Sequence, residues 1–421
     1  MVSIQSVDAL EILDSRGNPT LSATVTLSDG SLGSAQVPSG ASTGKHEAVE
    51  LRDGDPARYR GKGVRKAVEN VRRILGPSLQ GRPAEEQGSI DGWMIELDGT
   101  PDKSRLGANA MLGISCAFAR ALAARKRLAL WASLDFGIAP AMPVPMVNII
   151  SGGLHAGRQI EIQDFLMVPH GFDCMADRLE AVVACHHAAH DLLEAGGYRL
   201  TGVADEGGWG PALPSNERAL EILSEAITKT GLEGRASIAI DVAASHFLSG
   251  GVYRLTSEGR NLNRSELIDI LETWVERYPV IAIEDGLGED DWDGWIELTR
   301  RLGSRVRLIG DDLFTTSPHR LRRGIECGAA NSVLVKMNQI GTLTETMEVV
   351  RIAGEAGYGA VISARSGETE DSFLADLAVA SGAGEIKIGS VTRSERLAKY
   401  NRLLEIENQM KSAAPFTGVW G

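Results

Sequence analysis

The sequence has few cysteines and no long apolar segment. Its 421 residues contain only four cysteines (Cys116, Cys174, Cys185 and Cys327), and their spacing does not match a metal-binding pattern. We therefore expect reduced, mostly buried thiols. No run of 18 apolar residues occurs, and the first residues (MVSIQSV) contain neither a basic cluster nor an apolar stretch. These absences predict a soluble, cytoplasmic protein without a membrane span.

The chain also lacks an excess of basic charge. It has 43 Lys and Arg against 56 Asp and Glu, for a net charge of −13. Nucleic acid and anionic membrane are therefore unexpected partners. A small anionic substrate stays possible, because a metal ion and a few lysines or arginines can reverse the local field. With 43% hydrophobic residues, the chain can bury a large core and form more than one domain.

The first part of the chain, residues 1–137, has the pattern of an α+β domain. Short alternating strands are expected at residues 7–13, 20–27 and 32–37, with Asp29-Gly30 as a hairpin turn. Helical periodicity follows at residues 64–74 and 109–124. Residues 37–45 form a loop of small and hydroxyl side chains, which by composition alone is only a flexible loop. We predict three strands followed by helices.

The second part, residues 138–421, has the pattern of a barrel. Strands are expected at residues 144–150 and 160–168, and helices at residues 177–195 and 215–230. Six strand–helix units follow, with strands that begin near residues 237, 280, 306, 333, 360 and 385. Eight strands in about 280 residues fit an α/β barrel of the (β/α)8 type, with an irregular start.

Four of these predicted strands each end in an ionisable residue. The runs SIAID, VIAIE, VRLIGD and VLVK end at Asp241, Glu284, Asp311 and Lys336. The C-terminal ends of barrel strands converge on one mouth, where catalytic groups lie. Three carboxylates there would repel one another without a cation, and oxygen-only ligands favour a hard ion such as Mg²⁺. Surface acids at loop starts would explain one such residue, but not three in register together with a lysine.

Several ordered sequence blocks resemble the enolase family over essentially the whole chain. They are DSRGNPT at 14–20, PSGASTG at 38–44, DEGG at 205–208, IEDGL at 283–287, GDDL at 310–313, LVKMNQIG at 334–341, RSGET at 365–369 and RSERLAK at 393–399. The resemblance implies an N-terminal α+β domain followed by a ββαα(βα)6 barrel. It also implies a homodimer or a higher homo-oligomer.

The resemblance implies a Mg²⁺-dependent elimination. Such enzymes remove a proton from the carbon next to a carboxylate and then expel a β-hydroxyl, with a Lys or His base and one or two Mg²⁺ ions. Asp241, Glu284 and Asp311 match the ligands of the first Mg²⁺, a Lewis acid on the substrate carboxylate. Lys336 matches the base, and we expect Mg²⁺ and Lys387 to lower its pKa. Lys387 would also offset charge on the substrate carboxylate.

The remaining site residues follow from the same resemblance. Glu206 matches the acid that protonates the leaving hydroxyl, and Arg365 and Ser366 match phosphate ligands. Ser42 matches the residue that closes over a second Mg²⁺, which the substrate phosphate completes. His155 matches the family's active-site histidine, and we expect Asp164 to be a further catalytic residue and Gln163 a further substrate ligand. For His155, a purely structural histidine is the alternative to an active-site role.

Three residues depart from the family pattern around the expected substrate. Asp164 stands where the family has Glu, Arg158 stands where it has Asn, and Ala364 stands where it has His. Together they suggest a roomier and more cationic pocket near the phosphoryl group, with the base and metal ligands retained. This favours a specialised relative, such as the carboxyphosphonoenolpyruvate synthase of phosphinothricin-type phosphonate biosynthesis. Its product is phosphoenolpyruvate with one phosphate oxygen replaced by a carboxylate.

Two other functions stay open at this point. One is the glycolytic reaction, 2-phosphoglycerate to phosphoenolpyruvate, which needs the same metal and base. The other is a non-catalytic binding protein. The chain keeps the residues that match the acid, the metal ligands and the lysine base, which argues against this function. His186, His187 and His190 could suggest a metal site on a helix, but no acid partner is nearby in the pattern, so we expect packing or a helix face.

Overall fold

A three-stranded antiparallel sheet opens the chain in the computed structural model, which describes residues 1–40 and 44–410. The strands pair in the order β1-β2-β3, and their bounds are β1 Ile4–Leu13, β2 Pro19–Leu27 and β3 Leu32–Gln36. Alternate residues of β2 (Leu21, Ala23 and Val25) are fully buried. The long helix α4 (Ala108–Lys126) packs against β2 and β3. The approach is close, since a Cβ on Gly33 would lie 2.1 Å from the Ala117 carbonyl oxygen.

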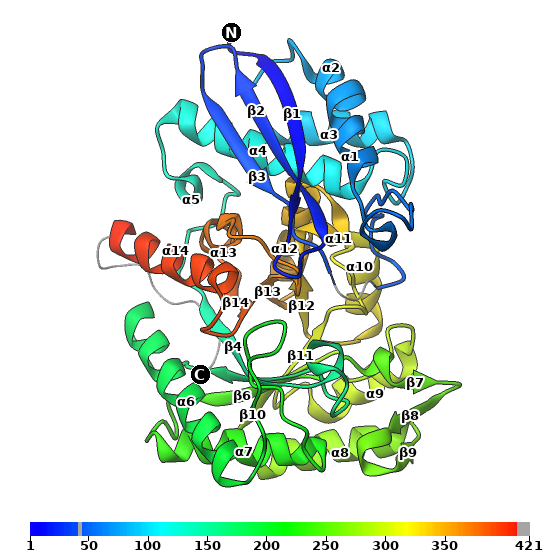
Figure 1. Ribbon diagram of the computed structural model, residues 1–421, viewed down its shortest axis with the longest axis vertical. Coiled ribbons are helices and arrows are strands. Elements are labelled where there is room, and N and C mark those ends of the chain that lie inside the picture. Colours follow the sequence, from blue (N-terminus) through cyan, green and yellow to red (C-terminus); the bar gives the residue numbers. More distant parts are fainter. Residues whose placement is uncertain (41–43, 411–421) are drawn as a thin grey trace.

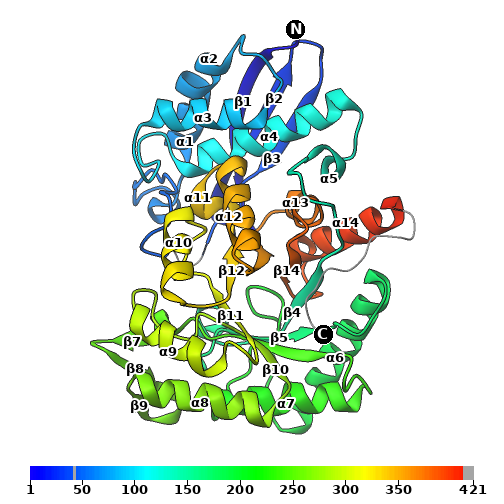
Figure 2. The same cartoon turned by 180° about the vertical axis from the view of Figure 1, so that it is seen from behind.

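The other helices of this part surround the sheet at one end of the molecule (Figures 1 and 2). They are α1 Arg65–Asn70, α2 Gly76–Leu79, α3 Gln87–Asp98 and α5 Leu130–Ser133. The predicted helix at 64–74 is present, and one π-helical turn, Val71–Leu75, joins α1 to α2. Helix α3 was not predicted. It contains Gly88 and Gly92, which lower helix propensity and interrupt the apolar periodicity.

Eight strands close into a barrel in the order β10-β11-β12-β13-β14-β4-β5-β6. Strand β5 runs antiparallel to both β4 and β6, and the other pairs are parallel. The strands are β4 Val144–Ser151, β5 Asp164–Val168, β6 Ser237–Asp241, β10 Val280–Glu284, β11 Arg307–Gly310, β12 Ser332–Val335, β13 Gly359–Ser363 and β14 Gly384–Gly389. The predicted fold class, an α+β unit followed by a ββαα(βα)6 barrel, is confirmed.

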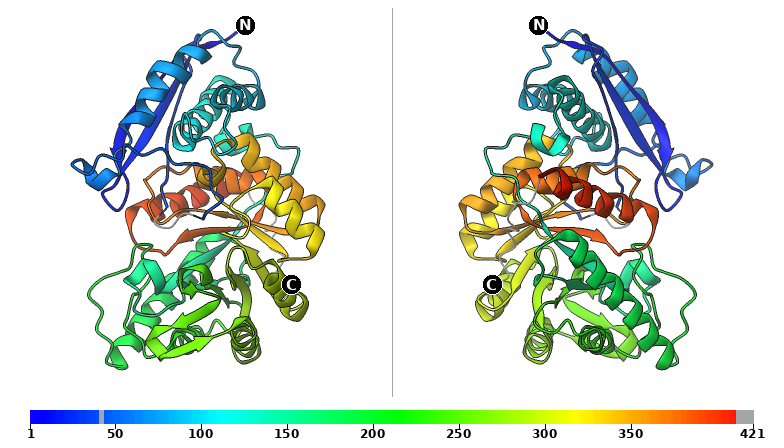
Figure 3. Two further views of the ribbon diagram at one scale, coloured as in Figure 1. Left: turned by 90° about the vertical axis from the view of Figure 1, so that its right-hand side faces the viewer. Right: turned by 90° about the vertical axis from the view of Figure 1, so that its left-hand side faces the viewer.

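Helices cover the outside of the barrel, as the side views show (Figure 3). They are α6 Met175–Ala195, α7 Asn216–Lys229, α8 Arg264–Arg277, α9 Trp292–Leu302, α10 Pro318–Cys327, α12 Leu343–Glu355, α13 Phe373–Ser381 and α14 Ser394–Met410, with the short α11 Met337–Ile340 after β12. Side chains fix where several of them begin. Asn263 and Glu266 form a reciprocal capping box at the start of α8, which satisfies backbone N–H groups that a helix start leaves open.

The strand predicted at 160–168 begins later than expected, at Asp164. Ile160 and Ile162 are buried, but the backbone N–H groups of Glu161 and Ile162 donate to the side-chain oxygen of Asn216, at 3.0 and 2.9 Å. This side chain takes the place of a neighbouring strand. Residues 160–163 are therefore a loop that reaches the barrel mouth.

A small sheet of three short strands was also not predicted. It consists of β7 Leu248–Ser249, β8 Val252–Leu255 and β9 Arg260–Leu262, which project from the barrel after β6 (Figure 1). Gly250 and Gly251 both have positive φ (60° and 78°), as a tight hairpin turn requires. Strands of two to four residues carry too short a pattern to recognise.

The interior of the barrel is filled by side chains. A separate buried cluster takes one or two apolar residues from every barrel strand except β14, among them Met146, Leu166, Ala239 and Val361. The four cysteines are free thiols; Cys116 and Cys185 are buried, and Cys174 and Cys327 are half-buried. Within residues 1–40 and 44–410, no helix is both long and apolar enough to cross a membrane.

Candidate active site

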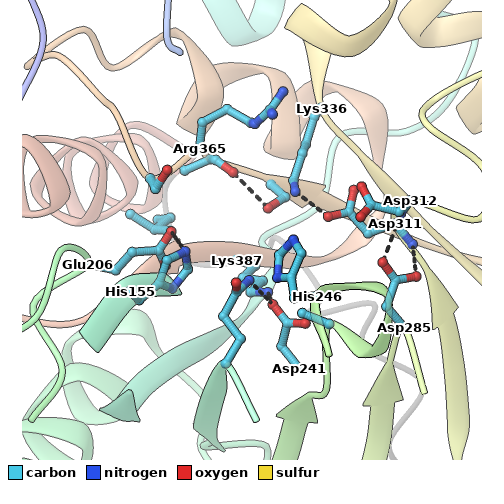
Figure 4. A pocket seen from close by; sticks show the side chains of 16 residues that line it. His155, Glu206, Asp241, His246, Asp285, Asp311, Asp312, Lys336, Arg365 and Lys387 are labelled. Carbon is cyan, nitrogen blue, oxygen red and sulfur yellow. Dashed lines mark hydrogen bonds and ion pairs between the residues drawn. The ribbon is translucent and has the colours of Figure 1, made fainter. Parts of the chain in front are cut away.

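A narrow pocket of about 30 Å³ lies at the C-terminal ends of the barrel strands (Figure 4). We call it the central pocket. Its walls bring together residues from most of the strand ends. They are His155, Gln163, Glu206, Asp241, Ala243, His246, Asp285, Asp311, Asp312, Lys336, Ser363, Ala364, Arg365, Ser366, Lys387 and Ile388. Ten of the residues predicted from the sequence line this pocket, although they are spread over more than 200 positions.

Lys387 joins two of the predicted metal ligands. Its Nζ lies 2.8 Å from Asp241 Oδ2 and 2.7 Å from Glu284 Oε2, and all three side chains are buried. Burial and the neighbouring Asp241 raise the pKa of Glu284 well above its ordinary value. Glu284 Oε1 is buried without a hydrogen-bond partner among the described residues. This oxygen is left available for a cation.

Lys336 forms an ion pair with Asp311, whose other oxygen accepts a hydrogen bond from Gln339 Nε2 at 2.9 Å. The expectation of a lowered pKa for Lys336 included a bound Mg²⁺, and without the metal the balance is different. Burial acts to lower the pKa of this amine, but the Asp311 carboxylate opposes it, and the pKa of Lys336 is raised. The effect of Lys387 has the expected direction but is smaller.

Asp285 and Asp312 were not predicted as site residues, although each directly follows a predicted metal ligand. Asp285 accepts hydrogen bonds from the backbone N–H groups of Asp311 (2.9 Å) and Asp312 (2.8 Å). It holds this position with φ +42°, a left-handed conformation that is uncommon outside glycine. Ligand atoms of Asp285, Asp311 and Asp312 lie within 4.8 Å of one another. Asp285 therefore orients the end of β11. The consecutive acidic residues in the blocks IEDGL and GDDL were the sequence feature that could have identified Asp285 and Asp312 as site residues.

His155, Asp164 and Glu206 form a second cluster, within 4.8 Å. His155 Nδ1 lies 2.9 Å from Asp164 Oδ2, and Nε2 lies 3.7 Å from Glu206 Oε1. Burial opposes the charge on His155, but the two carboxylates raise its pKa to about 9. His155 is therefore protonated at neutral pH and faces Glu206 across the pocket wall, as Figure 4 shows.

Asp164 lies behind His155 and does not line the central pocket. It is fully buried and also accepts hydrogen bonds from Asn148 Nδ2 and from Ser151 Oγ (3.0 Å). It thus orients the imidazole of His155 rather than facing the pocket space. Gln163, next to it, does line the pocket and donates to Asp241 Oδ2 at 3.1 Å.

Arg365 and Ser366 lie on the wall that also carries Ala364. The Arg365 guanidinium donates to Glu47 Oε2 (3.0 Å) and to Asn338 Oδ1 (2.9 Å). Arg16 Nη1 donates to Ser366 Oγ at 3.3 Å. Glu47, Asn338 and Arg16 were not predicted, because nothing in the sequence places the N-terminal segment or Asn338 against the loop that follows β13.

One predicted substrate ligand, Arg158, does not line the central pocket. Another, Ser42, lies outside the described residues. Arg158 lines a neighbouring cavity, whereas Ala364 lines the central pocket. Arg158 and Ala364, two of the three departures from the family pattern, therefore line different cavities. His246 lines both cavities. His246 was not predicted either.

Two of the three histidines of α6, His186 and His190, pack against Trp209, and His187 is exposed. The expectation that no acid lies near them is wrong for His190, which is 3.5 Å from Asp191 and 3.7 Å from Glu194. The His186 ring lies 4.6 Å from the Trp209 ring, and the His190 ring lies 4.8 Å from it, measured between centroids. His186 is buried, which lowers its pKa to about 4. It is therefore neutral at physiological pH, and the ring packs against Trp209 as an apolar group.

The central pocket fits a hard divalent cation. Asp241, Glu284 and Asp311 supply only carboxylate oxygens from adjacent strand ends, and one buried oxygen of Glu284 has no other partner among the described residues. Carboxylate oxygens are the donors that Mg²⁺ prefers. Lys336 and Lys387 pair with these carboxylates and balance their negative charge.

Comparison with protein families gives two matches that together span nearly the whole chain. Residues 4–134 match the model described as "Enolase, N-terminal domain". Residues 139–420 match the model described as "Enolase, C-terminal TIM barrel domain". The second match alone covers more than half of the chain and includes most residues of the central pocket.

Proposed function

The chain belongs to the enolase family, and from this premise we propose the reaction that the central pocket carries out. The reaction removes a proton from the carbon next to a carboxylate and expels a β-hydroxyl from a substrate of the 2-phosphoglycerate type, leaving an enolpyruvate. Lys336 is the base, and Glu206 with His155 supplies the proton to the leaving hydroxyl. The domain boundary lies near residues 137 and 138.

The observation that carries this proposal is the separation of basic and acidic groups on opposite walls. Lys336 lies beside Asp311 on one side, and Glu206 lies beside the protonated His155 on the other. An anti-elimination needs a base and an acid that face different groups of the substrate. His155 Nε2 lies 3.7 Å from Glu206 Oε1, which is an ion pair beyond hydrogen-bond length. In the proposed reaction the protonated His155 supplies a proton that Glu206 passes to the leaving β-hydroxyl of the substrate.

Asp241, Glu284 and Asp311 would hold Mg²⁺, which supplies positive charge beside the substrate carboxylate as a Lewis acid. With its carboxylate committed to the cation, Asp311 would no longer hold the proton on Lys336. Lys387 contributes a further fixed positive charge next to Asp241 and Glu284. Ser42 is proposed for a second Mg²⁺ that the substrate phosphate completes. Arg365 and Ser366 bind the phosphoryl oxygens.

We further propose a specialised substrate, the phosphonoformyl analogue of 2-phosphoglycerate that carboxyphosphonoenolpyruvate synthases use. Ala364 supports this, because a methyl side chain stands beside Arg365 where the family pattern has the larger imidazole of His. The test measures kcat/KM for 2-phosphoglycerate and for the analogue, on wild type and on the triple variant Ala364→His, Arg158→Asn and Asp164→Glu. Wild type should prefer the analogue, and the triple variant should shift preference toward 2-phosphoglycerate by roughly ten- to a hundredfold.

The glycolytic reaction is the second candidate. Its support is that Glu206, Lys336, Asp241 and Asp311 line the central pocket together, and that the third proposed metal ligand, Glu284, contacts it through Lys387. If wild type turns over 2-phosphoglycerate efficiently and ignores the analogue, the glycolytic function stands and the specialised one fails. We also propose a cytoplasmic location, which the free thiols support, and a homodimer, which sedimentation would test.

A further inference from the structure

A second cavity adjoins the central pocket and is much larger. We call it the side pocket; its volume is about 340 Å³, against about 30 Å³ for the central pocket. The loop after β4 forms one wall with Leu154, Arg158 and Ile160, and the β7–β8 hairpin forms the other with Leu248 and Arg254. Neither wall was predicted from the sequence.

The side pocket carries an excess of positive charge. Arg158 and Arg254 both line it, from opposite walls. Neither guanidinium has a carboxylate within ion-pair distance among residues 1–40 and 44–410, although most arginines near the barrel mouth do, such as Arg320 and Arg365. Both side chains are exposed, so water solvates their charges until an anion replaces it.

The acidic residue in the lining of the side pocket is already engaged elsewhere. Glu161 lines the same cavity, but its Oε1 accepts from the Ser257 backbone N–H (2.8 Å). Its Oε2 accepts from Ser257 Oγ (2.6 Å) and from Asn216 Nδ2 (2.9 Å). The carboxylate thus ties the loop to the neighbouring helix starts, and the two arginines keep their charges for a ligand.

The backbone at Arg158 indicates that its side chain matters. Arg158 has φ +60°, in the left-handed region, directly after Gly157 with φ +68°. A residue with a Cβ is destabilised there by roughly 1 kcal/mol relative to glycine. A long cationic side chain is thus held at a position where glycine or asparagine would fit with less strain.

His246 connects the two cavities. Its side chain lines both of them, and Figure 4 shows it at the central pocket together with Lys336, Lys387 and Asp241. Its Nδ1 is buried and has no hydrogen-bond partner within the described part of the chain. A buried polar atom without a partner at such a junction is suited to a ligand group that extends from one cavity into the other.

We propose that the side pocket is a second anion subsite for the substrate, which binds a carboxylate or phosphoryl-type group through Arg158 and Arg254, with His246 at the junction. The proposal rests on the proposed function, because it assumes that the substrate's reacting end occupies the central pocket. A cavity of about 30 Å³ has little room for a further charged group. The adjoining cavity has both the room and the charge.

The test is calorimetric binding of two ligands, 2-phosphoglycerate and its phosphonoformyl analogue, in the presence of Mg²⁺. The variants are Arg158→Gln and Arg254→Gln, with Arg260→Gln as the matched control. Arg260 lies on the same small sheet but pairs with Glu258 outside the side pocket. The quantity compared is the ratio of the analogue's affinity to that of 2-phosphoglycerate. Arg158→Gln and Arg254→Gln should each lower this ratio about tenfold, and Arg260→Gln should leave it unchanged.

An unchanged ratio in both Arg158→Gln and Arg254→Gln would overturn the proposal. Arg254→Lys, which keeps the charge, should recover part of the lost ratio and guards against a folding defect. Turnover is followed separately. If neither ligand is dehydrated, the proposed function fails, while the affinity ratios still decide the subsite.

Discussion

The Glu47 carboxylate, from the N-terminal part of the chain, lies 3.0 Å from the guanidinium of Arg365 on the barrel wall. Both side chains are buried, and burial opposes the charge on Arg365 while Glu47 raises the pKa of the guanidinium. Asn338, after β12, shares the same guanidinium. The proposed phosphate ligand is therefore held in place from two parts of the fold before any substrate arrives.

Replacing Glu47 by Gln should destabilise the protein. The change leaves the buried Arg365 without its countercharge, and loss of one partner of a buried ion pair typically lowers the free energy of unfolding by about 3 kcal/mol. Urea denaturation measures this loss. Glu69→Gln is the control, because Glu69 forms an exposed pair with Arg73 that is worth below about 1 kcal/mol. Equal stability of the two variants would contradict this account of Glu47.

Exchange with solvent deuterium should separate the base from the acid. Lys336→Ala should abolish exchange of the substrate's α-proton, because proton removal comes first. Glu206→Gln should retain part of the exchange but lose net elimination, since the hydroxyl would leave without a proton. Proton NMR of the substrate in D₂O follows exchange, and product absorbance follows elimination. Wild-type exchange rates in both variants would show that these roles are wrongly assigned.

Removal of divalent metal should abolish activity, and Mg²⁺ should restore it. A cation that binds only the folded protein raises its stability, by about 2.7 kcal/mol at one hundred times Kd. Mg²⁺ should therefore raise the Tm of wild type but not of Asp311→Asn or Glu284→Gln. Asp269→Asn, on the exposed face of α8, serves as the control and should respond like wild type. A full Mg²⁺ response in Asp311→Asn would exclude Asp311 as a ligand.

Much of the fold could be predicted because the barrel strands have long, buried and β-branched patterns. Strands β6 and β10 begin and end where the sequence places them. Elements with weak patterns were missed, such as α3 with its two glycines and the two- to four-residue strands β7, β8 and β9. At residues 160–163 the Asn216 side chain accepts the backbone hydrogen bonds that a neighbouring strand would otherwise accept. The local pattern of apolar and polar residues does not reveal such a replacement.

The central pocket was predictable where an ionisable residue ends a strand, and less so elsewhere. Spacing places Asp241 and Lys387 at one mouth, but it does not show that Lys387 bridges Asp241 and Glu284. The function of Glu47 depends on how the N-terminal segment packs on the loop that follows β13, which no sequence block encodes. The position of Arg158 in the side pocket depends on a positive φ and on an unpredicted hairpin.

The last prediction concerns the pH dependence of stability at His155. Its pKa is about 9 in the folded protein, because Asp164 and Glu206 outweigh the effect of burial, and 6.5 is its ordinary value. Between these values the folded state holds a proton that the unfolded chain releases, so the stabilisation is complete below pH 6.5 and disappears as pH rises through 9. The difference corresponds to about 3 kcal/mol.

Urea denaturation from pH 6 to pH 10 measures this loss directly. Wild type should lose about 3 kcal/mol more than His155→Gln over that range, because glutamine can donate a hydrogen bond to Asp164 but carries no titrating proton. His186→Gln is the matched control. His186 is buried with a pKa of about 4, and an unfolded histidine with its ordinary pKa of 6.5 is also neutral above roughly pH 8. From pH 8 to pH 10 its variant should therefore keep the wild-type slope. If His155→Gln shows the same slope as wild type, His155 is not the group that holds the proton, and the proton delivery proposed through Glu206 must be abandoned.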